Sequence, residues 1–183
     1  MKKSSIPLLI IVTLLSVVSA AAQSAELRPE PLSPKGRVAF NKLFSACVFR
    51  IGGVGYAAQT SKEELALYDL LEEREAIGAL KSLVATASYE GGLYGLLGLS
   101  IRNHTEFNMA VEIYKARKER PEWQTTGSFN CFRAEGEMVT TQSGCIISTE
   151  SRDKVVADIQ SGRFDKLLNA KYQQTIPIFG YKR

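Results

Sequence analysis

An apolar stretch with regularly spaced glycines places the tightest constraint on how this chain can fold. Residues 91–99 read Gly-Gly-Leu-Tyr-Gly-Leu-Leu-Gly-Leu and carry no charged side chain. Each interior glycine costs a helix up to about 1 kcal/mol relative to alanine, so propensity alone disfavours a helix here. The stretch is flanked by helical patterns, however, and glycines at this spacing let a neighbouring helix approach closely. We therefore predict a buried helix, because about ten residues are too few to span a membrane.

Helical periodicity extends over much of the remaining chain. Apolar residues recur at intervals of three and four, which is the spacing of one helix face. Ser61 and Glu64 form a capping box, Thr105 and Ser151 stand where N-caps are expected, and Gly162 ends the last pattern. The pattern predicts further helices over residues 35–51, 61–71, 73–87, 105–120 and 154–159.

A change of texture marks residues 128–148. Short runs of strand-forming residues at 128–132, 138–141 and 145–148 are separated by glycine-containing turns. These runs predict a small hairpin or three-stranded insert. The expected fold class is therefore mainly α: a compact, repeat-like bundle of about five to six helices built from helical hairpins, with a disulfide-closed β-hairpin insert.

The N-terminus has the composition of an export signal. Lys2 and Lys3 precede an apolar run over residues 6–18, and three alanines follow at 20–22. We expect cleavage after Ala22 or Ala20. The alternative, an uncleaved anchor, is disfavoured because the run covers only part of the roughly 30 Å hydrocarbon layer. The predicted organisation is a signal peptide (1–22), a flexible lead-in (23–34) and a single helical domain (35–183), exported to the periplasm or the extracellular space.

Three cysteines follow the signal, and export would place them where thiols oxidise. Three pairings are open, each of which leaves one thiol over. Cys131 and Cys145 flank the β-type segment, whereas Cys47 lies in a helical pattern. We therefore predict a Cys131–Cys145 disulfide, which would close a loop of about fifteen residues and contribute on the order of 3 kcal/mol. Cys47 would then remain a buried thiol.

Packing residues between Tyr94 and Pro121 suggest a pair of antiparallel helices. Leu97-Gly98 would belong to the first helix, and Ala110 and Tyr114 to the second. In this arrangement the stretch resembles a single tetratricopeptide-type helix pair. The resemblance implies an interaction module, because such repeats bind peptides or proteins on a concave face. A generic helical hairpin explains the same residues, and a repeat array needs about three copies, of which only one is visible.

Charge and motifs exclude several function classes. The net charge is only +4, and the basic run from Lys115 to Arg120, which includes acidic Glu119, is typical of a solvated helix end rather than a nucleic-acid surface. His104 is the only histidine, and no residues at zinc-ligand spacing accompany it. The glycine groups match no nucleotide-binding motif. We therefore predict no cofactor, no metal site and no nucleic-acid partner.

These observations favour an exported, non-catalytic helical domain that binds another protein or a peptide, of an inhibitor, chaperone-like or envelope-associated type. No membrane span is expected after signal cleavage. The alternative is a small secreted enzyme of unidentified chemistry. Cys47 and His104 are its only nameable pair, and they would have to meet in the fold.

Overall fold

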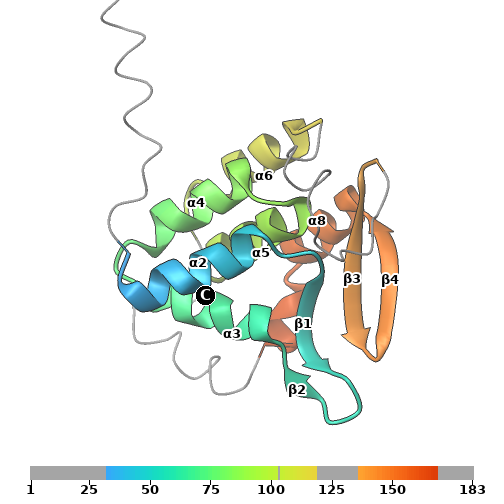
Figure 1. The fold of residues 1–183 in the computed structure, drawn as a ribbon. Helices are drawn as coiled ribbons and strands as arrows, with labels where there is room; N and C mark the ends of the chain where they lie inside the picture. Colours follow the sequence, from blue (N-terminus) through green and yellow to red (C-terminus); the bar gives the residue numbers. More distant parts are fainter. Residues whose placement is uncertain (1–31, 103, 119–135, 169–183) are drawn as a thin grey trace, which may run out of the picture.

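A computed structural model describes residues 32–102, 104–118 and 136–168 of the chain. The predicted signal peptide (1–22) and Cys131 lie outside these ranges. The described part contains six α-helices, one 3₁₀ helix and a four-stranded sheet that stands at one side of the helices (Figure 1). The helices are α2 (Pro34–Phe44), α3 (Lys62–Leu71), α4 (Ala76–Thr86), α5 (Tyr89–Ile101), α6 (Phe107–Ala116), α8 (Arg152–Gln160) and the 3₁₀ helix η1 (Arg163–Lys166). The strands are β1 (Phe49–Val54), β2 (Gln59–Thr60), β3 (Met138–Gly144) and β4 (Ile146–Ser151).

Helix α5 is the predicted buried helix, and every residue from Tyr89 to Leu99 is buried. Its first turn is capped by Ser88, whose hydroxyl accepts a hydrogen bond from the Gly91 N–H at 2.8 Å. A Cβ placed on Gly95 would lie 2.7 Å from the Leu80 carbonyl oxygen of α4. The glycine spacing thus lets the α4 backbone approach α5, which confirms the reason given for the helix.

The predicted fold class is wrong, because the chain combines its helices with a mixed sheet of order β2-β1-β3-β4. Strands β1 and β3 are parallel and are connected through helices α3 to α6, whereas the two outer pairs are antiparallel. Strand β1 lies where the first predicted helix continued to residue 51. Helix α2 ends at Phe44, and Phe49 and Ile51 then point into the core from an extended chain.

The β3–β4 hairpin belongs to this sheet and is not closed by a disulfide. Cys145 is a free, exposed cysteine at its turn, so the predicted Cys131–Cys145 pair is wrong. Cys47, which was expected to be a free thiol, is disulfide-bonded. The hairpin is closed by a tight turn, in which Gly144 adopts a positive φ of 58° and Ser143 pairs with Ile146 directly across the turn.

Two predicted helix caps have different outcomes. Ser61 accepts from the Glu64 N–H at 3.0 Å, as expected for the first half of a capping box. The Glu64 carboxylate reaches strand β1, where it accepts from the Gly52 N–H at 2.9 Å. Thr105 caps no helix: α6 begins after Glu106, without a side-chain cap.

Candidate functional site

A groove of ≈ 200 Å³ lies between the sheet and the α8–η1 segment. Phe49 of β1 and Val155 of α8 belong to its lining and are 2% and 1% exposed. Phe164 of η1 packs edge-on against the Phe49 ring, with 5.3 Å between centroids. Ile146 and Leu167 also line the groove, and they are 71% and 46% exposed. The groove therefore has a buried apolar floor and an exposed apolar mouth.

Charged side chains along the groove are paired with one another. Glu150 of β4 forms an ion pair with Lys154 at 2.5 Å, and Asp158 of α8 forms one with Arg163 at 2.7 Å. These pairs leave little net charge to attract an anion or a cation. The volume is also below the roughly 300–1,000 Å³ typical of pockets for drug-sized ligands. The groove is therefore suited to one large apolar side chain.

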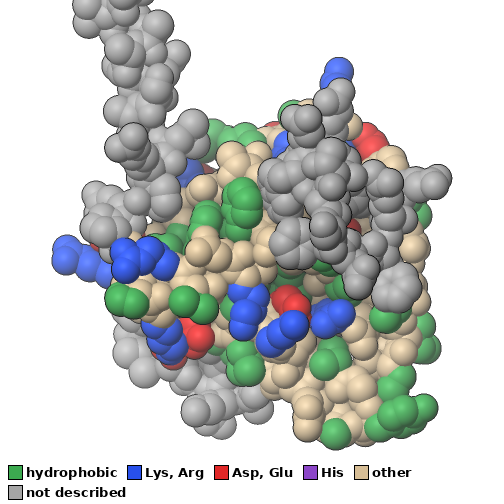
Figure 2. Space-filling view, viewed as in Figure 1, with side chains coloured by type: hydrophobic (Ala, Val, Ile, Leu, Met, Phe, Trp, Pro, Cys, Tyr) green, Lys and Arg blue, Asp and Glu red, His purple; other side chains and the backbone are tan. Residues whose placement is uncertain are grey.

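Exposed hydrophobic side chains gather at the free end of the β3–β4 hairpin, which lies at the lower right of Figure 2. Ile146 and Ile147 are the exposed large hydrophobic residues of β4, with 71% and 44% of their surface accessible. Side chains alternate between the two faces of a strand. Ile146 belongs to the groove face, and Ile147 therefore belongs to the opposite face.

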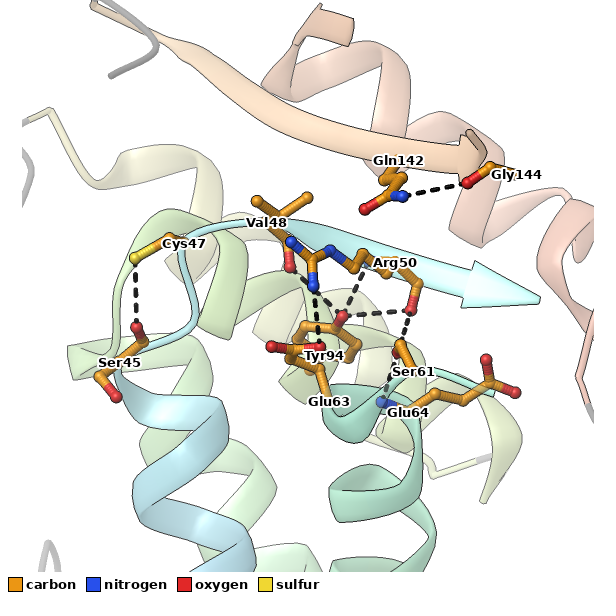
Figure 3. Close-up of polar contacts among 10 residues, drawn as sticks. All are labelled: Ser45, Cys47, Val48, Arg50, Ser61, Glu63, Glu64, Tyr94, Gln142 and Gly144. Carbon is orange, nitrogen blue, oxygen red and sulfur yellow. Dashed lines mark hydrogen bonds and ion pairs between the residues drawn. The ribbon is translucent and has the colours of Figure 1, made fainter. Parts of the chain in front are cut away.

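Apart from the groove, a polar cluster joins β1 to helices α3 and α5 (Figure 3). The hydroxyl of Tyr94, which is fully buried, accepts from the Arg50 N–H at 2.8 Å and lies 3.1 Å from the Arg50 carbonyl oxygen. Burial raises the pKa of Tyr94 well above its usual value, so the phenol stays neutral. The Arg50 side chain lies 3.5 Å from the Glu63 carboxylate. These contacts fasten β1 to the helices, and we assign them a structural role.

The sequence predicted that the basic run after α6 lies in solvent. In the structure, part of this run is packed against the helices. The Arg117 guanidinium donates to the Val84 and Ala87 carbonyl oxygens and lies over the Tyr89 and Tyr114 rings. Burial lowers the pKa of Arg117. The side chain therefore holds the end of α6 against α4 and α5, and it is not available as a surface cation.

The only catalytic pair nameable from the sequence lacks its nucleophile. Cys47 is disulfide-bonded and so offers no thiolate. His104 lies in the turn between α5 and α6, where its Nδ1 accepts from the Glu106 N–H at 3.2 Å. Within the ranges that the structure describes, no group of three or more His, Cys, Asp or Glu side chains could hold a metal ion.

Sequence reasoning named none of the groove residues as site residues, because an exposed isoleucine on an edge strand has the same sequence signature as a buried one.

No helix in the described part of the chain is both long enough and apolar enough to cross a membrane. No family model, no characterised protein and no solved structure matches the chain.

Proposed function

We propose that this chain is an exported domain that binds an extended segment of another protein and seats one large apolar side chain of that segment in the groove between the sheet and α8–η1. The groove supports this proposal because its buried floor meets an exposed mouth at Ile146 and Leu167. Protein interfaces commonly depend on such an anchor side chain in a desolvated pocket.

The expected anchor is uncharged. Glu150 and Asp158 are already paired with Lys154 and Arg163, so a charged anchor would have to displace an internal partner. Full burial of a leucine or phenylalanine side chain contributes about 1.5–3 kcal/mol, equivalent to roughly a tenfold to 150-fold gain in affinity. An anchor of this kind would therefore account for a substantial share of a moderate affinity.

Selection from a displayed peptide library tests the proposal. The full chain, expressed with its own export signal, is immobilised, and bound peptides are enriched over several rounds. We expect the enriched peptides to share one large apolar residue. The affinity of the best peptide is then measured by fluorescence polarisation for wild type, Leu167→Asp and Met109→Asp.

The two variants are matched, because Leu167 at the groove and Met109 on α6 are 46% and 51% exposed. A carboxylate at position 167 places an unpaired charge at the groove mouth, so Leu167→Asp should weaken binding at least tenfold. Met109→Asp should leave the affinity within about twofold, as expected of a surface change. An equal loss in both variants, or a selection that enriches no peptide, would contradict the proposal.

A further inference from the structure

The outer edge of β4 presents backbone groups that have no partner within the described residues. Their direction follows from Thr140 of β3, whose N–H donates to the Glu90 carboxylate at 3.1 Å and therefore points away from β4. Thr140 lies opposite Thr149 in the β3–β4 register. In an antiparallel pair, hydrogen-bonded and non-hydrogen-bonded positions alternate. The N–H and C=O groups of Thr149, and of Ile147 two residues earlier, consequently point outward.

Among the features that usually prevent strands from pairing with another chain are charged side chains, proline, bulges and short length. The only charged residue of β4 is Glu150, which is paired with Lys154. Strand β4 has six residues, with no lysine or proline, and pairs with β3 over six consecutive positions. Ile147 is 44% exposed beside the outward groups. The other edge of the sheet, β2, is only two residues long. Strand β4 is thus the edge that can accept a further strand.

We propose that this edge pairs with β4 of a second copy of the chain, antiparallel, about a two-fold axis at Ser148. In this register Ile147 of each copy lies opposite Thr149 of the other, and each pair exchanges two hydrogen bonds. Ser148 lies opposite its counterpart at a non-hydrogen-bonded position, where Cα atoms are about 4.5 Å apart. The two four-stranded sheets become continuous.

The direction of the backbone groups and the two ends of the strand together favour this register. An outward-pointing residue must lie opposite another, so the two-fold axis passes at a residue of the strand and not between two residues. An axis at Ile147 would place Thr149 opposite Cys145, in the turn that precedes β4. An axis at Thr149 would place Ile147 opposite Ser151, whose side chain caps α8. The axis at Ser148 pairs Ile147 with Thr149 and keeps both hydrogen-bonded pairs clear of the turn and of the residue that caps α8.

Side-chain pairing agrees with this register. Ile147 opposite Thr149 is a β-branched pair, which is favourable across strands. Glu150 lies opposite Ile146, so its stem covers an isoleucine that is 71% exposed in the single chain. The two Glu150 residues are four strand positions apart, about 14 Å at 3.4 Å per residue, and do not oppose each other. The pairing uses the backbone edge of β4, and its contact on Ile146 leaves Leu167 as the exposed apolar residue of the groove mouth.

Disulfide trapping tests the register. In a Cys145→Ser background, Ser148→Cys places two cysteines about 4.5 Å apart between Cα atoms, within the 4.4–6.8 Å range of disulfides. Mild oxidation should give a covalent dimer on a non-reducing gel. Glu150→Cys in the same background is the control, because its counterparts are too far apart and should stay unlinked. Equal cross-linking of the two variants, or none in either, would overturn the register.

Sedimentation measures the association itself. The Cys145→Ser chain should dimerise reversibly, and Ile147→Lys should weaken the dimer at least tenfold because it places a charge at the pairing edge. Ile113→Lys on α6 is the matched control, since Ile113 and Ile147 are 43% and 44% exposed. It should dimerise like its parent. A parent that stays monomeric at millimolar concentration, or equal effects of the two lysines, would overturn the proposal.

Discussion

Close packing between α4 and α5 makes a prediction in which one substitution has opposite effects at two positions. Gly95→Ala would place a Cβ 2.7 Å from the Leu80 carbonyl oxygen and 2.9 Å from a Val84 methyl carbon. Overpacking of this kind costs about 1–3 kcal/mol, and the better helix propensity of alanine offsets up to about 1 kcal/mol of it. The expected net effect is a loss of about 1–2 kcal/mol.

Gly78→Ala in α4 is the matched control, because nothing lies within 4 Å of its added Cβ. It should stabilise the protein by about 0.4–1 kcal/mol, chiefly by restricting the unfolded chain. Urea unfolding followed by circular dichroism measures both free energies. The two variants should differ by roughly 1.4–3 kcal/mol, or about 3–12 °C in Tm for a chain of this size. If Gly95→Ala is as stabilising as Gly78→Ala, the argument that α5 needs glycine for close helix approach is wrong.

Two further predictions concern the buried hydroxyl of Tyr94 and the pairing state of the cysteines. Tyr94→Phe leaves the Arg50 N–H without its acceptor and should lower the free energy of unfolding in urea by about 1–3 kcal/mol. Tyr56→Phe, at a fully exposed side chain, is the control and should be neutral. Equal effects of the two variants would contradict the structural role assigned to Tyr94. Thiol labelling of the oxidised, denatured chain should modify Cys145 and spare Cys47, and mass spectrometry that finds the label on Cys47 would contradict the pairing state described above.

Sequence patterns predicted the structure correctly where a segment's own residues determine its environment. The stretch around α5 is apolar on every side, so burial follows whatever its neighbours are. Ser61 caps α3 because the hydroxyl and the N–H it serves are three residues apart. In both cases the decisive contact, or the lack of any polar face, can be read within a few residues of chain.

Strand β1 could not be found in this way. Val48 and Ile51 satisfy the helical spacing as the continuation of a periodic stretch, yet the chain is extended there. The extended conformation is determined by the parallel pairing of Phe49 with Thr141, which lies more than ninety residues further along the chain. Such non-local pairing leaves no mark near the strand itself, and the groove and the β4 edge depend on it.

Buried acids show why the orientation of the sheet escaped sequence reasoning. Glu64 and Glu90 look like ordinary residues of a first helical turn, but both are 1% exposed and accept from strand N–H groups of Gly52 and Thr140. A buried carboxylate is costly unless it is satisfied, so each acid can be buried only when its strand is correctly placed. Glu90 thereby sets the direction of the β3 backbone groups and, through the β3–β4 register, which groups of β4 face outward. The contact of Glu90 with Thr140 thus indicates which backbone groups face outward at the edge proposed to pair between copies.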